Sequence, residues 1–489
     1  MKAEIHKINT LNELEVFVNY IAPIFEKGDL LAINGEIGSG KTTLSKYLIN
    51  YLTEDRIDEV NSPTFNLCQT YSKQDLTISH YDFYRLDSLQ EIEELDISDS
   101  IKNNFTIIEW ANKFSSILPK DHIEIQIKNK SHEREYKILF HGKYTKKITA
   151  HKNRLSFLSN SNFNIKKITN MRGDASSRKY YRVNDSMKNF VLMDASEDSI
   201  KKTTTSKTIT DFIIFGKYLE KIGLRVPKIY KFDIQKKLIL EEDLGLTTYN
   251  ELYSKLSFED LVTPAIESLL ILVHSNYTNI NDLNGRAFEP HNFDEKLFIN
   301  ESKIFIDYYW PYVKNSICPE EEKCKFLSIM EQIYSDLSTD KTLILRDYHS
   351  PNLHYLQNEK GHRKCALIDF QDALLGHPLY DLVSLAQDAR FTISEDKERY
   401  IVDAFKDKFL FNDFQLSKSS FNEQYQILAI QRSLKILGIF ARLSLLEGKN
   451  NYIIHMPRVV DYIRRSMDCS LLYNLTHWLK INFKDTFDV

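Results

Sequence analysis

Apolar residues in the first part of the chain follow a spacing that is typical of helices. In the segment TLNELEVFVNYIAPIF, residues 10–25, they recur every three or four positions. One face of the expected amphipathic helix is formed by Leu14, Val18, Ile21, Ala22 and Phe25. Thr10 and Glu13 have the spacing of a capping box at the helix start, and Gly28 follows the helix end.

Short apolar or alternating runs between the helical segments predict strands. These runs are Leu30–Ile33, Leu76–Tyr81, Phe105–Ile108 and the alternating HIEIQI at residues 122–127. Strands that alternate with helices are typical of an α/β domain. After residues 141–155 the pattern changes to several strands, which extend to KLILEEDLG at residues 237–245, and then to mostly helices. We therefore expect a small β-rich lobe followed by a larger helical lobe.

The change of pattern sets the expected domain boundary near Ala150. A chain of 489 residues is too long for one ordinary domain, so we expect one domain at residues 1–150 and another at residues 151–489. Hydrophobic residues at 42% and charged residues at 27% are typical of a globular protein in water. The formal net charge of −4 gives no reason to expect a chain-wide attraction to nucleic acid or membranes, although a local basic patch stays open.

The sequence contains no pattern that indicates a signal peptide, a membrane span or a cysteine-based site. The start MKAEIHKINTLNEL has charges where a signal peptide would have its apolar core, and no stretch has the roughly eighteen apolar residues of a membrane span. We therefore expect a cytoplasmic protein with no membrane partner. The five cysteines form no CxxC pair, so they indicate neither a disulfide framework nor a zinc site.

The sequence GEIGSGKTTL at residues 35–44 satisfies the Walker A pattern. In this pattern glycines let backbone N–H groups surround the phosphates, lysine reaches the terminal phosphates and threonine offers a hydroxyl to Mg²⁺. The predicted ATP-binding residues are Gly35, Gly38, Ser39, Gly40, Lys41, Thr42 and Thr43, of which Thr42 also binds Mg²⁺. The apolar residues that follow have helical spacing, so a helix begins where the phosphates need its N-terminal dipole.

Three more stretches accompany this P-loop, namely NSPTF at 61–65, HYDFYRL at 80–86 and IIEWANKF at 107–114. Together they resemble the TsaE family, the bacterial ATPase required for threonylcarbamoyladenosine synthesis on tRNA, over nearly the whole first domain. The resemblance implies that Asp82 binds Mg²⁺ as a Walker B carboxylate and that Thr64 lies in a nucleotide-sensing loop. It implies that Glu109, in a catalytic role, and Trp110 complete the ATPase site. It also implies TsaB- and TsaD-like proteins as partners, and tRNA through them.

A second phosphate-transfer signature, LRDYHSPNL, spans residues 345–353. Its Asp347-x4-Asn352 is followed, seventeen residues after Asn352, by Asp369 in LIDFQD. Kinase-type phosphoryl transfer needs a carboxylate at the acceptor hydroxyl, and an amide and a second carboxylate on Mg²⁺. Asp347 is therefore the candidate catalytic base, and Asn352 and Asp369 are candidate ligands of Mg²⁺. The letters TLILRD predict a strand that leads into this loop.

The chain lacks the GxGxxG, VAIK and APE segments, which disfavours a protein kinase. Through most of residues 155–480 it resembles instead the aminoglycoside-phosphotransferase-like sugar kinases. The stretches that carry the resemblance are GDASSRKYYRV at 173–183, FVLMDAS at 190–196, LEEDLG at 240–245, RDYHSPNLHYL at 346–356, LIDFQDALLGHPLYDLVSLAQDAR at 367–390 and QRSLKILGIFARL at 431–443. Within this group the chain is most similar to the AmgK type, which phosphorylates the anomeric hydroxyl of N-acetylmuramate and N-acetylglucosamine.

This resemblance implies further site residues. The ATP phosphates would be covered by Gly173, Ser176, Ser177 and Arg178, and Glu241 to Leu244 would form the hinge against adenine. Asp381 would brace the catalytic loop.

Two features of the second domain need separate interpretation. Where a kinase strand would carry its phosphate-binding lysine, the chain has Met193 and Asp194, and Arg178, Lys179 and Arg182 stay open as replacements. A helix over QRSLKILGIFARLSLLEGKN is predicted to end at Gly448 and to bury Leu434, Leu437, Ala441 and Leu445. We interpret Arg432 and Arg442, on or near this helix face, as structural residues.

A P-loop and a kinase catalytic loop are alternative ways of holding a triphosphate, so two independent sites are expected. We predict an α/β protein with an N-terminal P-loop NTPase domain and a C-terminal, bilobal, protein-kinase-like domain of the aminoglycoside phosphotransferase type. Both domains would use ATP and Mg²⁺. The predicted function joins the ATPase of tRNA threonylcarbamoyladenosine synthesis to an amino-sugar kinase of cell-wall recycling. Alternatives are an aminoglycoside or other small-molecule kinase or an inactive scaffold for the second domain, and a nucleotide-dependent regulatory binding module for the first.

Overall fold

The computed structural model describes residues 2–54, 57, 60–73, 76–130, 133–159, 165–171, 178–186, 188–197 and 208–487. The chain divides into two compact units. The first comprises Met1–Ser199 and Tyr230–Glu241, and the second comprises Ile200–Ile229 and Glu242–Val489. The first unit contains the P-loop domain, one connecting helix and most of a second sheet, whereas the second unit is the helical lobe.

The P-loop domain is built on a seven-stranded sheet with the strand order β1-β7-β6-β2-β5-β4-β3. Its strands are β1 (Lys2–Lys7), β2 (Leu30–Gly35), β3 (Cys68–Lys73), β4 (Leu76–Asp82), β5 (Phe105–Glu109), β6 (Ile123–Lys130) and β7 (Glu133–Phe140). The central strand β2 is parallel to β5 and β6, and β4 is parallel to β5. The four predicted strands are confirmed as β2, β4, β5 and β6, and the predicted α/β class is confirmed.

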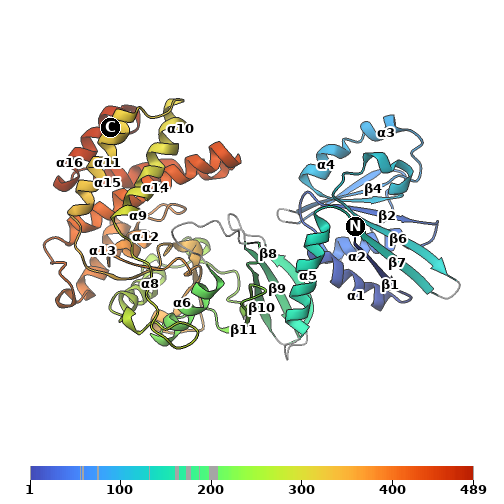
Figure 1. Cartoon of the computed structure of the whole chain (residues 1–489), viewed down its shortest axis with the longest axis horizontal. Helices are drawn as coiled ribbons and strands as arrows, with labels where there is room; N and C mark the ends of the chain where they lie inside the picture. Colours follow the sequence, from blue (N-terminus) through green and yellow to red (C-terminus); the bar gives the residue numbers. More distant parts are fainter. Residues whose placement is uncertain are drawn as a thin grey trace. The chain divides into compact units, whose positions relative to one another are not determined.

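Helices cover both faces of this sheet. α1 (Leu11–Ile21) and α2 (Lys41–Thr53) lie on one face, and α3 (Leu89–Glu93) and α4 (Ile97–Asn103) lie on the other (Figure 1). Strand β2 serves both cores, because successive side chains of a strand point to opposite faces. Leu31 and Ile33 pack with α1 and α2, whereas Leu30 and Ala32 belong to the core beneath α3 and α4.

The predicted N-terminal helix is confirmed as α1. The Thr10 hydroxyl accepts a hydrogen bond from the Glu13 N–H at 3.2 Å, and the Glu13 carboxylate accepts one from the Thr10 N–H at 3.0 Å, so the capping box is complete. The predicted inward side chains are all buried. The α-helix ends at Ile21 and continues as a 3₁₀ turn, Ala22–Ile24, because Pro23 has no N–H to donate to the carbonyl four residues earlier.

A single helix, α5 (Tyr144–Ser159), follows the P-loop domain and leads to a five-stranded sheet with the order β11-β12-β10-β9-β8. The strands of this sheet are β8 (Ile165–Met171), β9 (Lys179–Asp185), β10 (Asn189–Asp194), β11 (Ile229–Asp233) and β12 (Leu238–Glu242). Phe157 and Leu158 of α5 belong to the core of this sheet. Ala150 lies in the middle of α5, so the proposed boundary falls inside a continuous helix.

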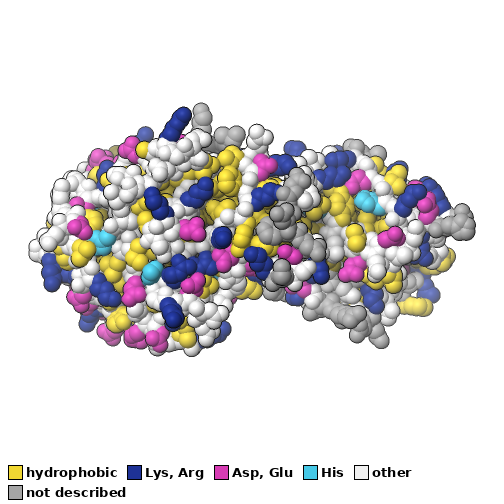
Figure 2. All heavy atoms as spheres, turned by 90° about the horizontal axis from the view of Figure 1, so that it is seen from below, with side chains coloured by type: hydrophobic (Ala, Val, Ile, Leu, Met, Phe, Trp, Pro, Cys, Tyr) yellow, Lys and Arg dark blue, Asp and Glu magenta, His cyan; other side chains and the backbone are white. Residues whose placement is uncertain are grey.

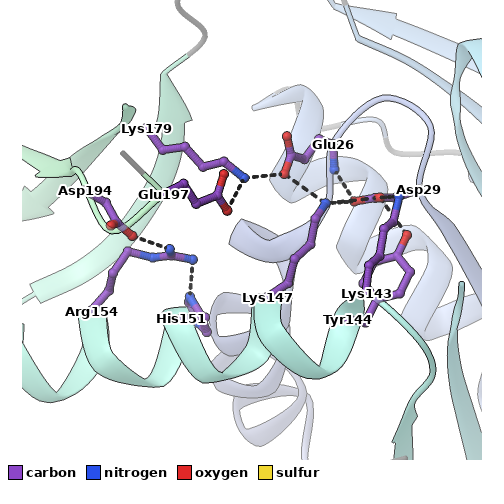
Figure 3. Close-up of polar contacts among 10 residues, drawn as sticks. All are labelled: Glu26, Asp29, Lys143, Tyr144, Lys147, His151, Arg154, Lys179, Asp194 and Glu197. Carbon is purple, nitrogen blue, oxygen red and sulfur yellow. Dashed lines mark hydrogen bonds and ion pairs between the residues drawn. The ribbon is translucent and has the colours of Figure 1, made fainter. Parts of the chain in front are cut away.

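Charged residues of α5 contact both the P-loop domain and the second sheet (Figure 3). Lys147 lies 2.9 Å from a carboxylate oxygen of Glu26 and 2.9 Å from one of Asp29. Further along the helix, Arg154 donates to Asp194 of β10 at 2.7 Å, and both side chains are buried. The helix is therefore bonded to both of its neighbours rather than being a free linker.

The second unit consists mostly of helices, as the sequence pattern predicts. They are α6 (Ile209–Lys221), α7 (Tyr249–Leu252), α8 (Phe258–Val273), α9 (Glu295–Ile304), α10 (Trp310–Lys314), α11 (Glu320–Ser335), α12 (Tyr380–Ala386), α13 (Glu395–Lys408), α14 (Phe421–Glu447), α15 (Met456–Ser466), α16 (Tyr473–Asn482) and α17 (Lys484–Phe487). Two short antiparallel pairs complete it, β13 (Thr342–Ile344) with β16 (Leu374–Gly376) and β14 (Leu353–Tyr355) with β15 (Cys365–Leu367).

The long helix α14 confirms the predicted helix end and corrects one position of the predicted buried face. Gly448 caps the helix with a φ of +65°. Leu434, Leu437 and Ala441 are buried, but Leu445 is 49% exposed. This leucine lies in the last turn of the helix, where residues 445–447 are all exposed, so the apolar face is buried only up to the preceding turn.

Among the described residues, none of the helices is long and apolar enough to cross a membrane. Basic and acidic side chains are interspersed on the face seen in Figure 2. This mixture agrees with the small formal net charge of −4.

Candidate functional sites

The P-loop connects β2 to α2 through left-handed backbone at two glycines. The φ of Gly38 is +75° and that of Gly40 is +100°, values that residues with a Cβ rarely adopt. Gly35 is required for space, because a Cβ there would lie 2.7 Å from the Ile127 carbonyl oxygen. Helix α2 begins at Lys41, directly after the loop, so its first N–H groups are available to an anion.

Lys41 folds back over its own loop. Its Nζ donates to the carbonyl oxygens of Gly35 and Glu36, both at 2.9 Å, and lies 3.8 Å from the centroid of the Trp110 ring. Burial lowers the pKa of Lys41, although nearby carboxylates act in the opposite direction. The ammonium group is thus held at the loop by neutral carbonyls, which phosphate oxygens can replace.

Glu109 ends β5 and is only 1% exposed. Its Oε2 accepts a hydrogen bond from Thr42 Oγ1 at 2.9 Å, and its Oε1 accepts from Ser45 Oγ at 2.9 Å. His80 Nε2 lies 2.8 Å from the same Oε1, which assigns the proton of this ring to Nε2. The predicted catalytic carboxylate is therefore fixed by three donors and joined to the predicted Mg²⁺ ligand Thr42.

Asp82 lies beside Glu109, because the parallel strands β4 and β5 pair these two residues at their carboxyl ends. Asp82 Oδ2 accepts from Thr64 Oγ1 at 2.8 Å and also from Ser62 Oγ, and its Oδ1 accepts from the Tyr84 N–H at 2.9 Å. The structure thus brings together the residues that the sequence places in three separate stretches.

A cavity of about 440 Å³ opens at this point. It is lined by the predicted residues Gly38, Gly40, Lys41, Thr42, Thr43, Thr64, Asp82, Glu109 and Trp110, and by Ile37, Ser62 and Tyr84. Gly35 and Ser39 belong to the loop but are not among the lining residues. A hydroxyl and a carboxylate are the hard oxygen ligands that Mg²⁺ prefers, so Thr42 and Asp82 fit this ion beside a phosphate cradle.

In the helical lobe the predicted catalytic loop follows β13. Asp381 of α12 accepts hydrogen bonds from the backbone N–H groups of Leu345 at 2.6 Å and Arg346 at 2.8 Å, as the interpretation of Asp381 as a brace requires. Burial raises the pKa of Asp381 to about 7, although the two N–H donors act against this shift. The φ of Arg346 is +71°, so the chain turns sharply directly before Asp347.

Cationic side chains surround the carboxylate of Asp347. Burial raises its pKa, but His349, Lys435 and arginine side chains outweigh burial and lower the pKa to about 2. His349 Nε2 lies 3.9 Å from Asp347 Oδ1, and the aspartate side chain is still 44% exposed. The predicted base is therefore an accessible carboxylate that stays ionised over the whole physiological range.

A buried glutamate, Glu301 of α9, holds two of these cations. It accepts hydrogen bonds from Lys435 Nζ at 2.8 Å and from the Arg346 guanidinium. Burial raises the pKa of Glu301, but the two cations outweigh burial and hold it below its usual value. The sequence pattern does not predict Glu301 as a site residue, and it places Lys435 only within a helix.

Asn352 and Asp369 lie together at the hairpin of β14 and β15. Asn352 Nδ2 donates to the backbone carbonyl of Asp347 at 3.0 Å and lies 3.5 Å from Asp369 Oδ2. Gln371 Nε2 donates to Asp369 Oδ1 at 2.5 Å, a contact that the sequence did not predict. The oxygen of an amide and the oxygens of a carboxylate are ligands of the kind that Mg²⁺ prefers, and the two side chains lie next to one another here.

The remaining predicted kinase residues are described in part. Gly173, Ser176 and Ser177 lie outside the described residues. Arg178 precedes β9 and Glu241 belongs to β12, and both are buried. Burial raises the pKa of Glu241 to about 8, and the charge of Arg178 acts against this shift. Leu244 lies half-buried in the segment after β12.

The structure disfavours Lys179 among the three candidates for the missing phosphate-binding lysine. Lys179 of β9 is paired with Asp194 of β10 in the sheet register, and its ammonium lies 3.1 Å from Glu26 and 3.4 Å from Glu197. Because successive residues of a strand point to opposite faces, Arg182 lies on the other face of the sheet from Lys179. Lys179 is therefore engaged with carboxylates on the α5 side, which disfavours it as the phosphate ligand.

Comparisons with known proteins identify both domains. The family model described as "Threonylcarbamoyl adenosine biosynthesis protein TsaE" matches residues 8–137, and that of the phosphotransferase enzyme family matches residues 167–408. A tRNA threonylcarbamoyladenosine biosynthesis protein TsaE of Rickettsia bellii is 36% identical over 121 residues, which cover 25% of this chain and 83% of that protein.

Two relatives correspond to the second domain. An N-acetylmuramate/N-acetylglucosamine kinase of Caulobacter vibrioides is 27% identical over 345 residues, which cover 66% of this chain and 94% of that protein. A kinase of the same name from Pseudomonas aeruginosa is 25% identical over 297 residues, which cover 60% of this chain and 82% of that protein. The chain therefore belongs to the TsaE family in its N-terminal domain, and this domain is joined to a region that matches the model of the phosphotransferase enzyme family.

Proposed function

We propose that the chain carries two separate ATP-dependent activities. The N-terminal domain is the ATPase component of tRNA threonylcarbamoyladenosine synthesis and acts in the cytoplasm with TsaB- and TsaD-like proteins, and through them with tRNA. The C-terminal domain phosphorylates the anomeric hydroxyl of N-acetylmuramate or N-acetylglucosamine for cell-wall recycling. The names of the Rickettsia and Caulobacter relatives support this assignment.

In the N-terminal site, the P-loop backbone and Lys41 hold the phosphates of ATP. Thr42 and Asp82 hold Mg²⁺, which when bound offsets the negative charge of the phosphates. Glu109 accepts a hydrogen bond from a water molecule and orients it toward the terminal phosphate. The three donors that fix Glu109 support this role, because they fix the orientation of its carboxylate before substrate arrives.

In the C-terminal site, Asp347 orients the sugar hydroxyl and accepts its proton as the bond to phosphorus forms. Asn352 and Asp369 would hold Mg²⁺, which would offset the negative charge of the phosphates. Asp381 fixes the backbone directly before Asp347. The observation that carries this proposal is the hydrogen bond from Asn352 to the Asp347 carbonyl, since it ties the proposed base to the proposed metal ligands at 3.0 Å.

The kinase proposal is tested by measuring ADP release from the full chain with N-acetylmuramate, N-acetylglucosamine, other sugars and aminoglycosides. We expect turnover with the two N-acetylated sugars and a phosphate on the anomeric carbon of the product. Phosphorylation at another hydroxyl, or turnover with aminoglycosides alone, would contradict the substrate assignment.

The ATPase proposal is tested by expressing the full chain in a bacterium depleted of its own TsaE. We expect the wild-type chain to restore threonylcarbamoyladenosine in tRNA, measured by mass spectrometry of nucleosides, and a Lys41→Ala chain not to restore it. Absence of rescue by the folded wild-type chain would count against the proposal.

A further inference from the structure

A cluster of two histidines and a glutamate lies in the P-loop domain outside the ATP cavity. His122 directly precedes β6, Glu124 is the second residue of β6, and His141 directly follows β7. One candidate ligand atom of each side chain lies within 4.8 Å of the others. We propose that His122, Glu124 and His141 bind a divalent transition-metal cation of the Zn²⁺ type.

The sheet register explains why these three residues meet. In the antiparallel pair β6–β7, Ile123 is opposite Phe140, and the His141 N–H donates to the His122 carbonyl at 3.0 Å, which continues the ladder by one residue pair. Residues directly opposite one another share a face of the sheet, and so do residues two apart on one strand. His122, His141 and Glu124 therefore project from the same face.

The two imidazole rings lie parallel to one another. Their centroids are 4.2 Å apart and their planes differ by 13°. His141 Nε2 lies 3.7 Å from Glu124 Oε2, close to the separation of about 3.3 Å that two ligands have in a tetrahedral zinc site with bonds of about 2.0–2.1 Å. Because an ion bound by an imidazole lies close to the plane of that ring, the stacked rings must turn about their side-chain torsions when the ion binds. A shift of a few tenths of an ångström brings the His141–Glu124 pair to coordination distance.

The hydrogen bonds of His122 and Glu124 leave one atom of each side chain available to a metal. His122 Nδ1 lies 2.7 Å from the Pro119 carbonyl oxygen, so Nδ1 carries the proton and Nε2 keeps its lone pair. Glu124 Oε1 accepts from Asn34 Nδ2 at 2.9 Å and from Gln126 Nε2 at 2.8 Å, which leaves Oε2 available. Such outer contacts typically orient the ligands of metal sites in proteins.

His141 provides a further observation, because its Nε2 lies near Glu124 but is too distant to form a hydrogen bond with it. Its Nε2 is buried and has no hydrogen-bond partner among the residues that the structure describes. A buried polar atom without a partner is costly, and a metal ion removes that cost. Two imidazoles and one carboxylate form a ligand set that favours zinc and related ions over Mg²⁺, and they leave a fourth position for water or a further ligand.

The test uses the metal-stripped full chain without a histidine tag and titrates Zn²⁺ against a chromophoric chelator. We expect one equivalent to bind, and the His122→Ala/His141→Ala variant to bind at least about 100-fold more weakly. The matched control is His291→Ala/His477→Ala, which removes two exposed histidines and should leave the affinity unchanged. Absence of the first equivalent in the wild type, or its persistence in the double variant, would overturn the proposal.

Two further measurements keep the test decisive if the double variant fails to fold. Glu124→Gln keeps the shape of the side chain and removes its charge, and Gln126→Ala removes only an outer contact, so we expect losses of affinity of about 100-fold and about ten-fold respectively. Co²⁺ in the wild-type site should give the intense visible absorption of four-coordinate cobalt, and this band should be absent in Glu124→Gln. Equal affinity in all of these variants would refute the site.

Discussion

The two proposed catalytic carboxylates are prepared in opposite ways. Glu109 is 1% exposed and is held by hydroxyl and imidazole donors, whereas Asp347 is 44% exposed and is surrounded by cations. Hydrogen bonds from three directions fix the position of a carboxylate, which suits the orientation of one small water molecule. Cations keep an accessible carboxylate ionised, which suits a group that must accept a hydrogen bond from the hydroxyl of a bulky substrate and orient it.

The two sites also differ in how they position the proposed metal ligands. In the P-loop domain they lie at the ends of parallel strands and on the first turn of α2, so the sheet itself sets their spacing. In the helical lobe they lie on a loop and a hairpin, and side chains from α9, α12 and α14 brace that loop. Substitutions at the P-loop site should therefore affect activity mainly through the altered residue itself. At the kinase site, substitutions in helices away from the loop should also affect activity.

The largest effect is expected for Asp347→Asn. Asparagine keeps the size of the side chain but cannot accept the proton, so the turnover number for N-acetylated sugars should fall by roughly two orders of magnitude or more. ATP binding and the rescue of a TsaE-depleted bacterium should persist. The matched control is Asp396→Asn, at a side chain that is 92% exposed. Near-normal sugar turnover in Asp347→Asn would contradict the proposed role of Asp347 as the catalytic base.

Glu109→Gln should show the reverse pattern. With Asp347→Asn as background and no sugar present, ATP hydrolysis by the chain should fall by roughly 100-fold, because the amide no longer accepts all three hydrogen bonds and orients water poorly. Sugar phosphorylation by the single Glu109→Gln variant should be unchanged. Glu15→Gln on the exposed side of α1 serves as control. A loss of sugar phosphorylation in the folded Glu109→Gln chain would show that the two sites are not independent.

The third expected effect, about ten-fold, concerns Asp381. Its pKa of about 7 means that the folded chain takes up a proton here as the pH falls below 7, which weakens the hold on the Leu345 and Arg346 N–H groups. Sugar turnover should therefore fall on the acid side of pH 7, far above the pKa of about 2 of Asp347. In Asp381→Asn, turnover at pH 8 should fall about ten-fold and the acid limb should vanish. If turnover of Asp381→Asn still fell below pH 7, the loss of activity would be due to another titrating group.

Much of this molecule could be predicted from local sequence because local physics decides it. The capping box of α1, the glycines of the P-loop and the strand that leads to Asp347 each depend on residues within one short segment. The partners of the buried carboxylates at the two sites could not be found in this way. His80 reaches Glu109 only through the pairing of β4 with β5, and Lys435 reaches Glu301 only through the packing of α14 against α9.

Helix α5 shows the same limit at the level of domains. Its sequence is rich in polar and charged residues, so the apolar pattern there is weak and predicts a domain boundary near Ala150. The charges are explained by contacts that the pattern could not reveal, such as Lys147 with Asp29 and Arg154 with Asp194. The cluster of His122, Glu124 and His141 was equally hidden, because strand register brings it together.

The smallest effect is expected for Lys179→Gln, which removes an ion pair between the second sheet and the P-loop domain. Lys179 and Glu26 are 25% and 37% exposed, and exposed ion pairs contribute only about 0–1 kcal/mol. The free energy of unfolding should therefore fall by less than about 1 kcal/mol, and the KM for ATP in sugar phosphorylation should change less than about two-fold.

Arg178→Gln and Arg182→Gln provide the contrast. If one of these residues replaces the kinase lysine, its variant should raise the KM for ATP by about ten-fold or more, because a charge-assisted contact to phosphate is worth about 1.5–3 kcal/mol. Initial rates are measured for all three variants at varied ATP and saturating sugar. They show which of the three residues contacts the phosphates of ATP. A ten-fold rise in KM for Lys179→Gln would return this lysine to the phosphate site and would mean that Glu26 of the P-loop domain competes with ATP for the same ammonium group, so that the two activities would be coupled through a single residue of β9.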